Sequence, residues 1–448
     1  MNINSRRIDR RSFLRAGASA AAVASAAQLT AVRALAGQGG GNDYKALVCV
    51  FLYGGADSFN LLVPTSAGGY ATYAASRGDL AESLSSLLPI SPLGVGSGEL
   101  GVHGSCPELQ ALFETGRLSF VSNVGPLAEP TTKSEFLGNT RQIPPYLFSH
   151  NDQQAQWQLA RASGQETAGW AGRVLDRMPT ASGTSAVAPG IGIDQTALML
   201  VGSQRAPYVL GSEGAVPIDG YEDPSRRGVR DALMNGASHP LEQAFGGTMS
   251  TSIAIHAELE SLLAGAPDFA GLFPASPLGA QLRMVARMIS IRAQLGVRRQ
   301  VFFVSMGGFD THDSQTMLLP GLFSQLSQAL AGFQSAVDQV GEASRVTTFT
   351  HSEFGRTLSS NGLGSDHGWG GHGLVMGGAV QGRRIVGTLP DLTLDGPDDI
   401  GDGRILPTTA VDQVAATLSR WFGLSTAELN AVFPNLSRFP VSDLGFMT

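Results

Sequence analysis

Cysteine is nearly absent from this chain of 448 residues, which contains only Cys49 and Cys106. Two cysteines do not make the disulfide framework that many small exported proteins depend on. A single bridge would need Cα atoms within about 7 Å, so the alternative is two small, buried apolar residues. Internal repeats and long runs of like charge are also missing, so nothing indicates a solenoid or a charged tail.

The chain also lacks an excess of basic residues. Its 30 Lys and Arg stand against 37 Asp and Glu, for a formal net charge of −7. Residues 1–36 carry six arginines and one aspartate, so the remainder has a net charge of −12. This acidic balance argues against a general nucleic-acid binder. An anionic substrate stays possible, because a bound cation can invert the local field.

The amino terminus has no unbroken apolar run long enough for a stable membrane span. Arg10-Arg11-Ser12-Phe13-Leu14 precedes an Ala-rich stretch that Arg33 interrupts and that ends in Ala34-Leu35-Ala36. This pattern is typical of a twin-arginine signal with a small-residue cleavage site. We therefore expect residues 1–36 to be a signal peptide, the export machinery to be a partner, and the mature protein to be periplasmic or secreted.

Three short segments, each after an apolar run typical of a β-strand, contain metal-ligand residue types. The run Ala46–Tyr53 leads into Gly54-Gly55-Ala56-Asp57-Ser58, Gln300–Met306 into Gly307-Gly308-Phe309-Asp310-Thr311-His312, and Arg345–Thr350 into residues 353–372. In open α/β sheets, ligands bind outside the carboxyl ends of the strands. Glycines there allow positive φ and close backbone approach. The sequence therefore predicts a site at the strand ends.

The alternation of strand, loop and helix patterns favours an α/β fold. We expect residues 44–448 to form one α/β domain, with a mostly helical insertion or cap over 200–295. Leu318–Val340 has amphipathic spacing, which predicts a helix that joins the second site strand to the third as a βαβ crossover.

The acidic and imidazole groups fall in two concentrations. Asp310 and His312 lie two residues apart, and Asp366, His367 and His372 lie in a Gly-rich loop. In loops after strands, such side chains could reach one ion. Each histidine taken singly could also be an ordinary hydrogen-bonded loop residue.

Two further carboxylates have competing interpretations. Asp57 at the end of the first strand is a candidate metal ligand, but it could instead cap the helix that follows. Glu353 is also a candidate ligand, but it could form a structural ion pair with Arg356.

Ordered motifs along residues 44–445 support a family resemblance. The chain resembles the twin-arginine-exported proteins of domain of unknown function 1501, within the alkaline-phosphatase and sulfatase superfamily. The motifs are RRSFL, YGGADSFNLLVP, FSHNDQQAQW, GWAGR, GGFDTHDSQ, SEFGRT, SDHGWGGHGLVMGGAVQG and the segment Leu406–Leu424.

The resemblance implies a mostly parallel sheet flanked by helices, with divalent ions bound at the strand ends. Phe354 follows Glu353 where the superfamily has an imidazole, so whether the site holds one ion or two stays open. Zn, Mn or Fe suits such mixed ligands better than Ca. The ligands implied are Asp57, Asp310, His312, Glu353 and His367, with Asp366 and His372 as helpers.

The resemblance also implies a nucleophile at a helix start. Ser149 matches that position best, Ser58 is its rival, and Ser149 could instead be a plain helix N-cap. His150 would orient the substrate anion or merely pack. Cys106 stands in the wrong context for the formylglycine residue of a sulfatase. Two arginines, Arg141 and Arg173, could bind a phosphate or sulfate oxygen.

These features predict an exported metal-dependent hydrolase of a phosphate or sulfate ester, on a small-molecule or glycan substrate. The alternative is a degenerate, non-catalytic member that acts as an envelope binding or assembly protein, which the missing imidazole after Glu353 favours. A lyase or phosphotransferase would share the same site chemistry.

Overall fold

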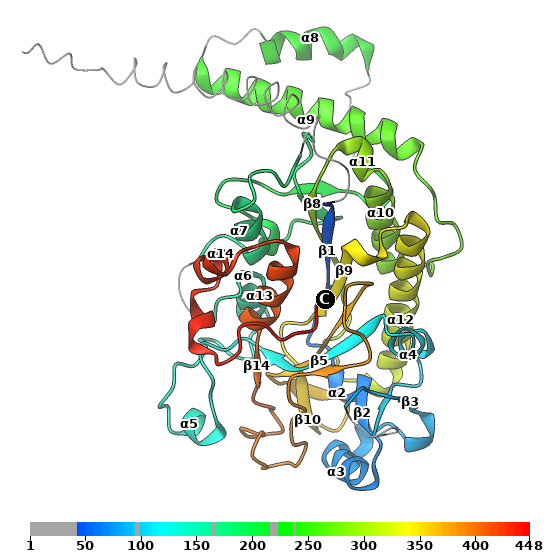
Figure 1. The fold of residues 1–448 in the computed structure, drawn as a ribbon, viewed down its shortest axis with the longest axis vertical. Coiled ribbons are helices and arrows are strands. Elements are labelled where there is room, and N and C mark those ends of the chain that lie inside the picture. The colour runs from blue at the N-terminus through cyan, green and yellow to red at the C-terminus, as the bar shows by residue number, and fades with distance from the viewer. Residues whose placement is uncertain (1–42, 95–98, 163–165, 184, 216–222, 236–238) are drawn as a thin grey trace, which may run out of the picture.

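A nine-stranded sheet forms the centre of the protein in a computed structural model (Figure 1). The structure describes residues 43–448 apart from 95–98, 163–165, 184, 216–222 and 236–238, so the predicted signal lies outside the described residues. The strand order is β13-β5-β12-β9-β1-β8-β6-β7, with β14 beside β5. The strands are β1 (Lys45–Leu52), β5 (Leu118–Gly125), β6 (Gly190–Ile193), β7 (Tyr208–Leu210), β8 (Arg299–Met306), β9 (Val346–His351), β12 (Gly371–Met376), β13 (Ile385–Val386) and β14 (Thr409–Ala410).

Strand β1 lies in the middle of this sheet, and every residue after Lys45 in it is buried. A parallel strand that is covered on both faces has a continuous apolar sequence, and KALVCVFL is such a sequence. Alternate side chains enter two different cores, because successive side chains of a strand point to opposite faces.

The register of the central strands brings the predicted site segments together. Strand β1 pairs in parallel with β8, where Leu52 lies opposite Met306, and with β9, where Phe51 lies opposite His351. The loops that follow these three strands therefore leave the sheet at one edge. Strand β12 is antiparallel to β5 and β9, with Gly371 opposite Val124, so the residues before it reach the same edge.

Helices cover both faces of the sheet, which confirms the predicted α/β fold. One core contains Cys106 and the other contains Cys49, and both cysteines are free and buried. Helices α4 (Pro107–Glu114), α10 (Pro277–Ser290) and α12 (Gln315–Val340) pack in the first core, and α6 (His150–Leu159), α7 (Trp170–Asp176), α13 (Val411–Phe422) and α14 (Thr426–Val432) in the second.

Helix α12 covers the predicted helix Leu318–Val340 and connects β8 to β9, as a crossover does. The segment 200–295 holds β7, α8 (Pro224–Asn235), α9 (Pro240–Ala264), α10 and α11 (Arg292–Leu295). Helix α10 belongs to the core, and α8 and α9 lie at the end of the molecule opposite α2 (Figure 1). They therefore do not cover the strand ends. None of the described helices is long and apolar enough to cross a membrane.

Smaller elements surround the edge where the strands end. The hairpin of β10 (Arg356–Ser360) and β11 (Ser365–His367) places Arg356 opposite His367. A second small sheet, with the strand order β2-β4-β3, lies near two short helices, α2 (Ser58–Leu61) and α3 (Ala67–Arg77) (Figure 1). Its strands are β2 (Leu62–Pro64), β3 (Leu88–Ile90) and β4 (Leu100–Val102), and a further short helix is α5 (Lys133–Leu137).

Candidate metal centre

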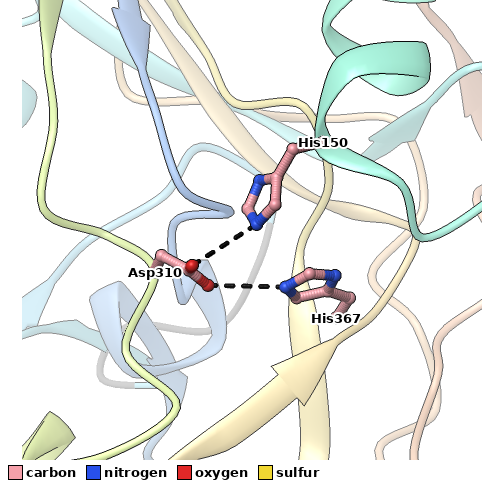
Figure 2. Close-up of side chains that lie close together, drawn as sticks. All are labelled: His150, Asp310 and His367. Atoms are coloured by element: carbon pink, nitrogen blue, oxygen red, sulfur yellow. Dashed lines mark ion pairs between the residues drawn. The ribbon is translucent and has the colours of Figure 1, made fainter.

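Four side chains from three separate segments converge at the strand ends. His150 begins α6, Asp310 and His312 follow β8, and His367 ends β11. Asp310 Oδ1 lies 3.2 Å from His312 Nε2 and 3.4 Å from His367 Nε2, and its Oδ2 lies 3.5 Å from His150 Nε2. Figure 2 shows the rings of His150 and His367 pointing at the Asp310 carboxylate. We call these four side chains the imidazole cluster.

The outer nitrogen of each imidazole has a partner that can only accept. His150 Nδ1 lies 2.8 Å from Glu353 Oε1. His312 Nδ1 lies 2.9 Å from Asp366 Oδ1. His367 Nδ1 lies 2.7 Å from the carbonyl oxygen of Phe148. Because carboxylate and carbonyl oxygens accept hydrogen bonds, each Nδ1 carries the proton and, in the neutral ring, each Nε2 presents a lone pair to the centre.

These inward lone pairs crowd one another. His312 Nε2 lies 2.8 Å from His367 Nε2, and the negative Asp310 carboxylate is next to both. Acceptors at such distances repel unless a proton or a cation lies among them. Metal-bound histidines usually donate the other ring N–H to a carboxylate or a backbone carbonyl. A divalent ion that takes nitrogen and oxygen ligands therefore fits this donor set.

Charge and solvent access at the cluster also favour a ligand role. Burial pushes the pKa of Asp310 up, but Arg356 and the three imidazoles outweigh it and hold that pKa below its usual range. Burial, with the neighbouring positive groups, lowers the pKa of His367. Asp310 is 49% exposed and His312 is 43% exposed, so a small molecule can reach the cluster from solvent.

Glu353 is fully buried, and its oxygens are already occupied. Oε1 accepts from Gly54 N at 2.9 Å, from Gln154 Nε2 at 2.9 Å and from His150 Nδ1. It therefore holds the His150 imidazole in place, and its predicted role as a metal ligand stays a prediction. The alternative ion pair with Arg356 is also not what the structure has, because Arg356 Nη2 donates to Asp310 Oδ1 at 3.1 Å.

Asp57 is fully buried and does not belong to the imidazole cluster. Its Oδ2 accepts from Arg77 Nη2 and, at 2.6 Å, from Gln315 Nε2. It precedes α2 but makes no side-chain capping hydrogen bond. The alternative role of a helix cap is therefore wrong for Asp57, whereas its role as a metal ligand stays a prediction.

Asp366 and His372 also occupy positions outside the cluster. Asp366 orients His312, and hydrogen bonds from Asn361 and His312 lower its pKa. His372 lies on β12, and its Nδ1 accepts from Asn123 N at 3.2 Å. Burial lowers the pKa of His372 to about 4, which favours the neutral ring, and its role as a helper ligand stays a prediction.

The two candidate nucleophiles have different surroundings. Ser149 stands at the start of α6 without capping it, and its hydroxyl donates to Asp152 Oδ2 at 2.6 Å. Its chain neighbours are Phe148, whose carbonyl oxygen accepts from His367 Nδ1, and His150, which belongs to the imidazole cluster. Ser58 is buried, and its Oγ accepts from His372 N at 2.6 Å, so this hydroxyl is held by backbone.

The two predicted anion-binding arginines have structural partners instead. Arg141 forms surface ion pairs with Glu129 and Glu135. Arg173 Nη2 donates to the carbonyl oxygens of Leu159 and Val432, at 2.8 and 3.1 Å.

Two features of the centre could not be predicted from the sequence. His150 was expected to orient substrate, but its Nε2 faces Asp310 together with the other imidazoles. Arg356 was considered only as a partner of Glu353. The one sequence signal for His150 was its place at a predicted helix start, and no local pattern links Arg356 to a residue 46 positions away.

A mostly parallel α/β protein with imidazoles and a carboxylate gathered at its strand ends is the class that fold and site define. The chain belongs to the family of proteins of unknown function DUF1501, whose model matches residues 44–433. This confirms the family that the motifs indicated. No curated protein matches the chain.

Solved structures similar to this chain include a protein in the alkaline phosphatase superfamily from Vibrio parahaemolyticus. The two chains share 9% sequence identity, and the match covers 89% of this chain and 74% of the other with a TM-score of 0.37. The lipoteichoic acid synthase LtaP from Listeria monocytogenes matches at 8% identity, 89% and 78% coverage and a TM-score of 0.34. The PsFucS1 sulfatase from Pseudoalteromonas sp. matches at 8% identity, 89% and 70% coverage and a TM-score of 0.32. The chemistry of the site rests on its own side chains.

Proposed function

We propose that this protein is a metal-dependent hydrolase of a phosphate or sulfate ester, with one divalent ion held by His150, Asp310 and His367 and with His312 next to them. The observation that carries the proposal is the orientation of the three imidazoles. Each one donates its outer N–H to a fixed acceptor and turns its other nitrogen toward Asp310. Zn, Mn and Fe suit this set of ligands.

Bound at such a site, a divalent ion supplies Lewis acidity toward an ester oxygen and lowers the pKa of a water ligand. The protein's own residues hold the three imidazole rings in position. Glu353 and Asp366 fix two of the rings, and the carbonyl of Phe148 fixes the third. The half-exposed side of Asp310 and His312 is where an anionic group would enter.

Ser149 is the proposed nucleophile. Its Oγ would form a bond to phosphorus or sulfur while the bond to the leaving alkoxide breaks, and its proton would pass to Asp152 Oδ2, to which it already donates. Water would then cleave the covalent ester and regenerate the hydroxyl. Ser58 is less suited, because its Oγ is buried and accepts a backbone hydrogen bond.

A second candidate function is a non-catalytic envelope binding or assembly protein. The pairing of Asp57 with Arg77 favours it, since a strand-end carboxylate expected to bind a cation is neutralised by a buried arginine instead. For either function we propose twin-arginine export to the periplasm or beyond, on the evidence of the Arg10-Arg11 motif.

Metal content and ester hydrolysis, measured on the same preparations, test the proposal. We expect near-stoichiometric Zn, Mn or Fe in the purified protein, and activity in a screen of phosphate and sulfate esters. His367→Ala should lose both. His256→Ala, on α9 and paired with Glu260, is the matched control and should lose neither. A wild-type protein without metal would refute the hydrolase, whereas metal without hydrolysis of any ester would favour the binding protein.

A further inference from the structure

Two fully buried arginines lie behind the imidazole cluster. Arg77 ends α3 and Arg356 begins β10, and neither side chain is exposed. Arginine is almost never fully buried unless it is paired, and its guanidinium stays protonated in proteins. Each therefore places a permanent positive charge next to an aspartate that follows a strand of the sheet.

The two guanidinium groups pair with the two aspartates that follow neighbouring strands. Arg77 Nη2 donates to Asp57 Oδ2, while its other nitrogens donate to Asn60 Oδ1 and to the backbone carbonyls of Thr357 and Leu358. Arg356 Nη2 donates to Asp310 Oδ1 at 3.1 Å. Arg356 also interacts electrostatically with Asp57.

The hydrogen bonding of Arg356 is incomplete. Among the described residues, its Nε and Nη1 have no hydrogen-bond partner, and neither does Asp57 Oδ1. An arginine that served only to tie the fold together would be expected to use these buried donors. What Arg356 contributes is mainly its charge, next to Asp310 and near Asp57.

We propose that Arg356 takes the place of a second metal ion, so that the centre binds one divalent cation and not two. This inference rests on the proposed metal site and answers the question of ion number that the sequence leaves open. A second cation would need Asp57, whose Oδ2 is paired with Arg77, or a further lone pair of Asp310 Oδ1, to which Arg356 already donates. Like charges at that distance repel strongly in a buried site.

Counting bound ions in the wild-type chain is the first test. Chelator-treated protein would be titrated separately with Zn²⁺ and Mn²⁺, and the bound ions counted by native mass spectrometry. We expect saturation at one equivalent. Two tight equivalents would overturn this inference and leave the hydrolase proposal standing, whereas no tight equivalent would overturn both.

Substitutions then test whether the charge of Arg356 is responsible. Arg356→Met removes the charge and should let a second equivalent bind, while Arg356→Lys, the matched control, should keep one. A single equivalent in a folded Arg356→Met variant would overturn the inference. Asp57→Asn gives an independent check, because it should change the affinity for the first ion by less than about threefold, against about 100-fold or more for Asp310→Asn. An equal loss in the two variants would make Asp57 a ligand and would also overturn it.

Discussion

Asp57 and Asp310 follow nearly the same local sequence and end in opposite environments. Gly54-Gly55-Ala56-Asp57 follows β1, and Gly307-Gly308-Phe309-Asp310 follows β8, its parallel neighbour. Yet Asp57 is fully buried and paired with Arg77, while Asp310 is 49% exposed and faces three imidazoles. The strand-end motif brings a carboxylate to the edge of the sheet, and its neighbours in space decide what that carboxylate does.

Replacing each aspartate by alanine should produce the largest difference between the two positions. Asp57→Ala leaves Arg77 buried without its carboxylate and should lower the free energy of unfolding by about 3–5 kcal/mol. Asp310→Ala should cost less stability but weaken metal binding by about 100-fold or more. Urea denaturation and metal titration of both variants would check this, and similar metal loss in the two would contradict the difference in role.

The next largest difference should be in stability, between substitutions of Gly54 and Gly307 in the two glycine-containing turns. A Cβ at Gly54 would lie 2.2 Å from the backbone nitrogen of Asp310, and Gly54 has a φ of +118°. We expect Gly54→Ala to destabilise the protein by about 2–4 kcal/mol and to displace Asp310, which weakens metal binding. Gly307→Ala is the matched control, because its Cβ would meet nothing within 4 Å, and it should change stability by less than about 1 kcal/mol.

A third aspartate, Asp412, is a buried carboxylate that differs from Asp57 in its hydrogen bonding. It is as buried as Asp57, but neither carboxylate oxygen has a hydrogen-bond partner among the described residues. Burial raises its pKa to about 7, although Arg161 and Arg173 oppose the rise. Stability from this group is therefore complete below the unfolded pKa of about 4 and is lost as the pH rises through 7.

Asp412→Asn should remove that loss and raise the free energy of unfolding at pH 8 by about 4 kcal/mol relative to its effect at pH 4. Thermal denaturation from pH 4 to pH 8 would measure it. If the stability of the wild-type protein did not fall over this range, the ionised Asp412 carboxylate would have to be stabilised by a hydrogen bond or a cation.

The smallest expected difference lies between the two carboxylates that hold imidazoles. Glu353→Gln should weaken metal binding by about tenfold, because the buried carboxylate fixes the His150 ring. Asp366→Asn should weaken it only a few-fold, because Asp366 is 53% exposed and water can replace it. Metal titration of the two variants would compare them, and an equal effect would mean that burial is not what gives Glu353 its importance.

Short continuous segments of the sequence were enough to predict the central strands, the position of their ends and part of the site. The apolar runs before Asp57 and Asp310 are local, and so is the amphipathic spacing that predicted α12, so neither needed knowledge of distant residues. The pair Asp310 and His312, and the loop with His367, also came from short spacing. Each belongs to one continuous segment whose properties follow from period and turn residues.

The roles of the side chains at the strand ends depend on contacts between segments that lie far apart in the sequence. His150 meets Asp310 from a helix start 160 residues earlier in the chain, Glu353 accepts a hydrogen bond from the His150 ring, and Asp57 pairs with Arg77. Electrostatic partners are chosen by distance in space and by burial, which strengthens an ion pair as water is excluded. Neither quantity has a period in the sequence, so the same Gly-Gly-x-Asp motif could end either as a buried ion pair or as a candidate metal ligand.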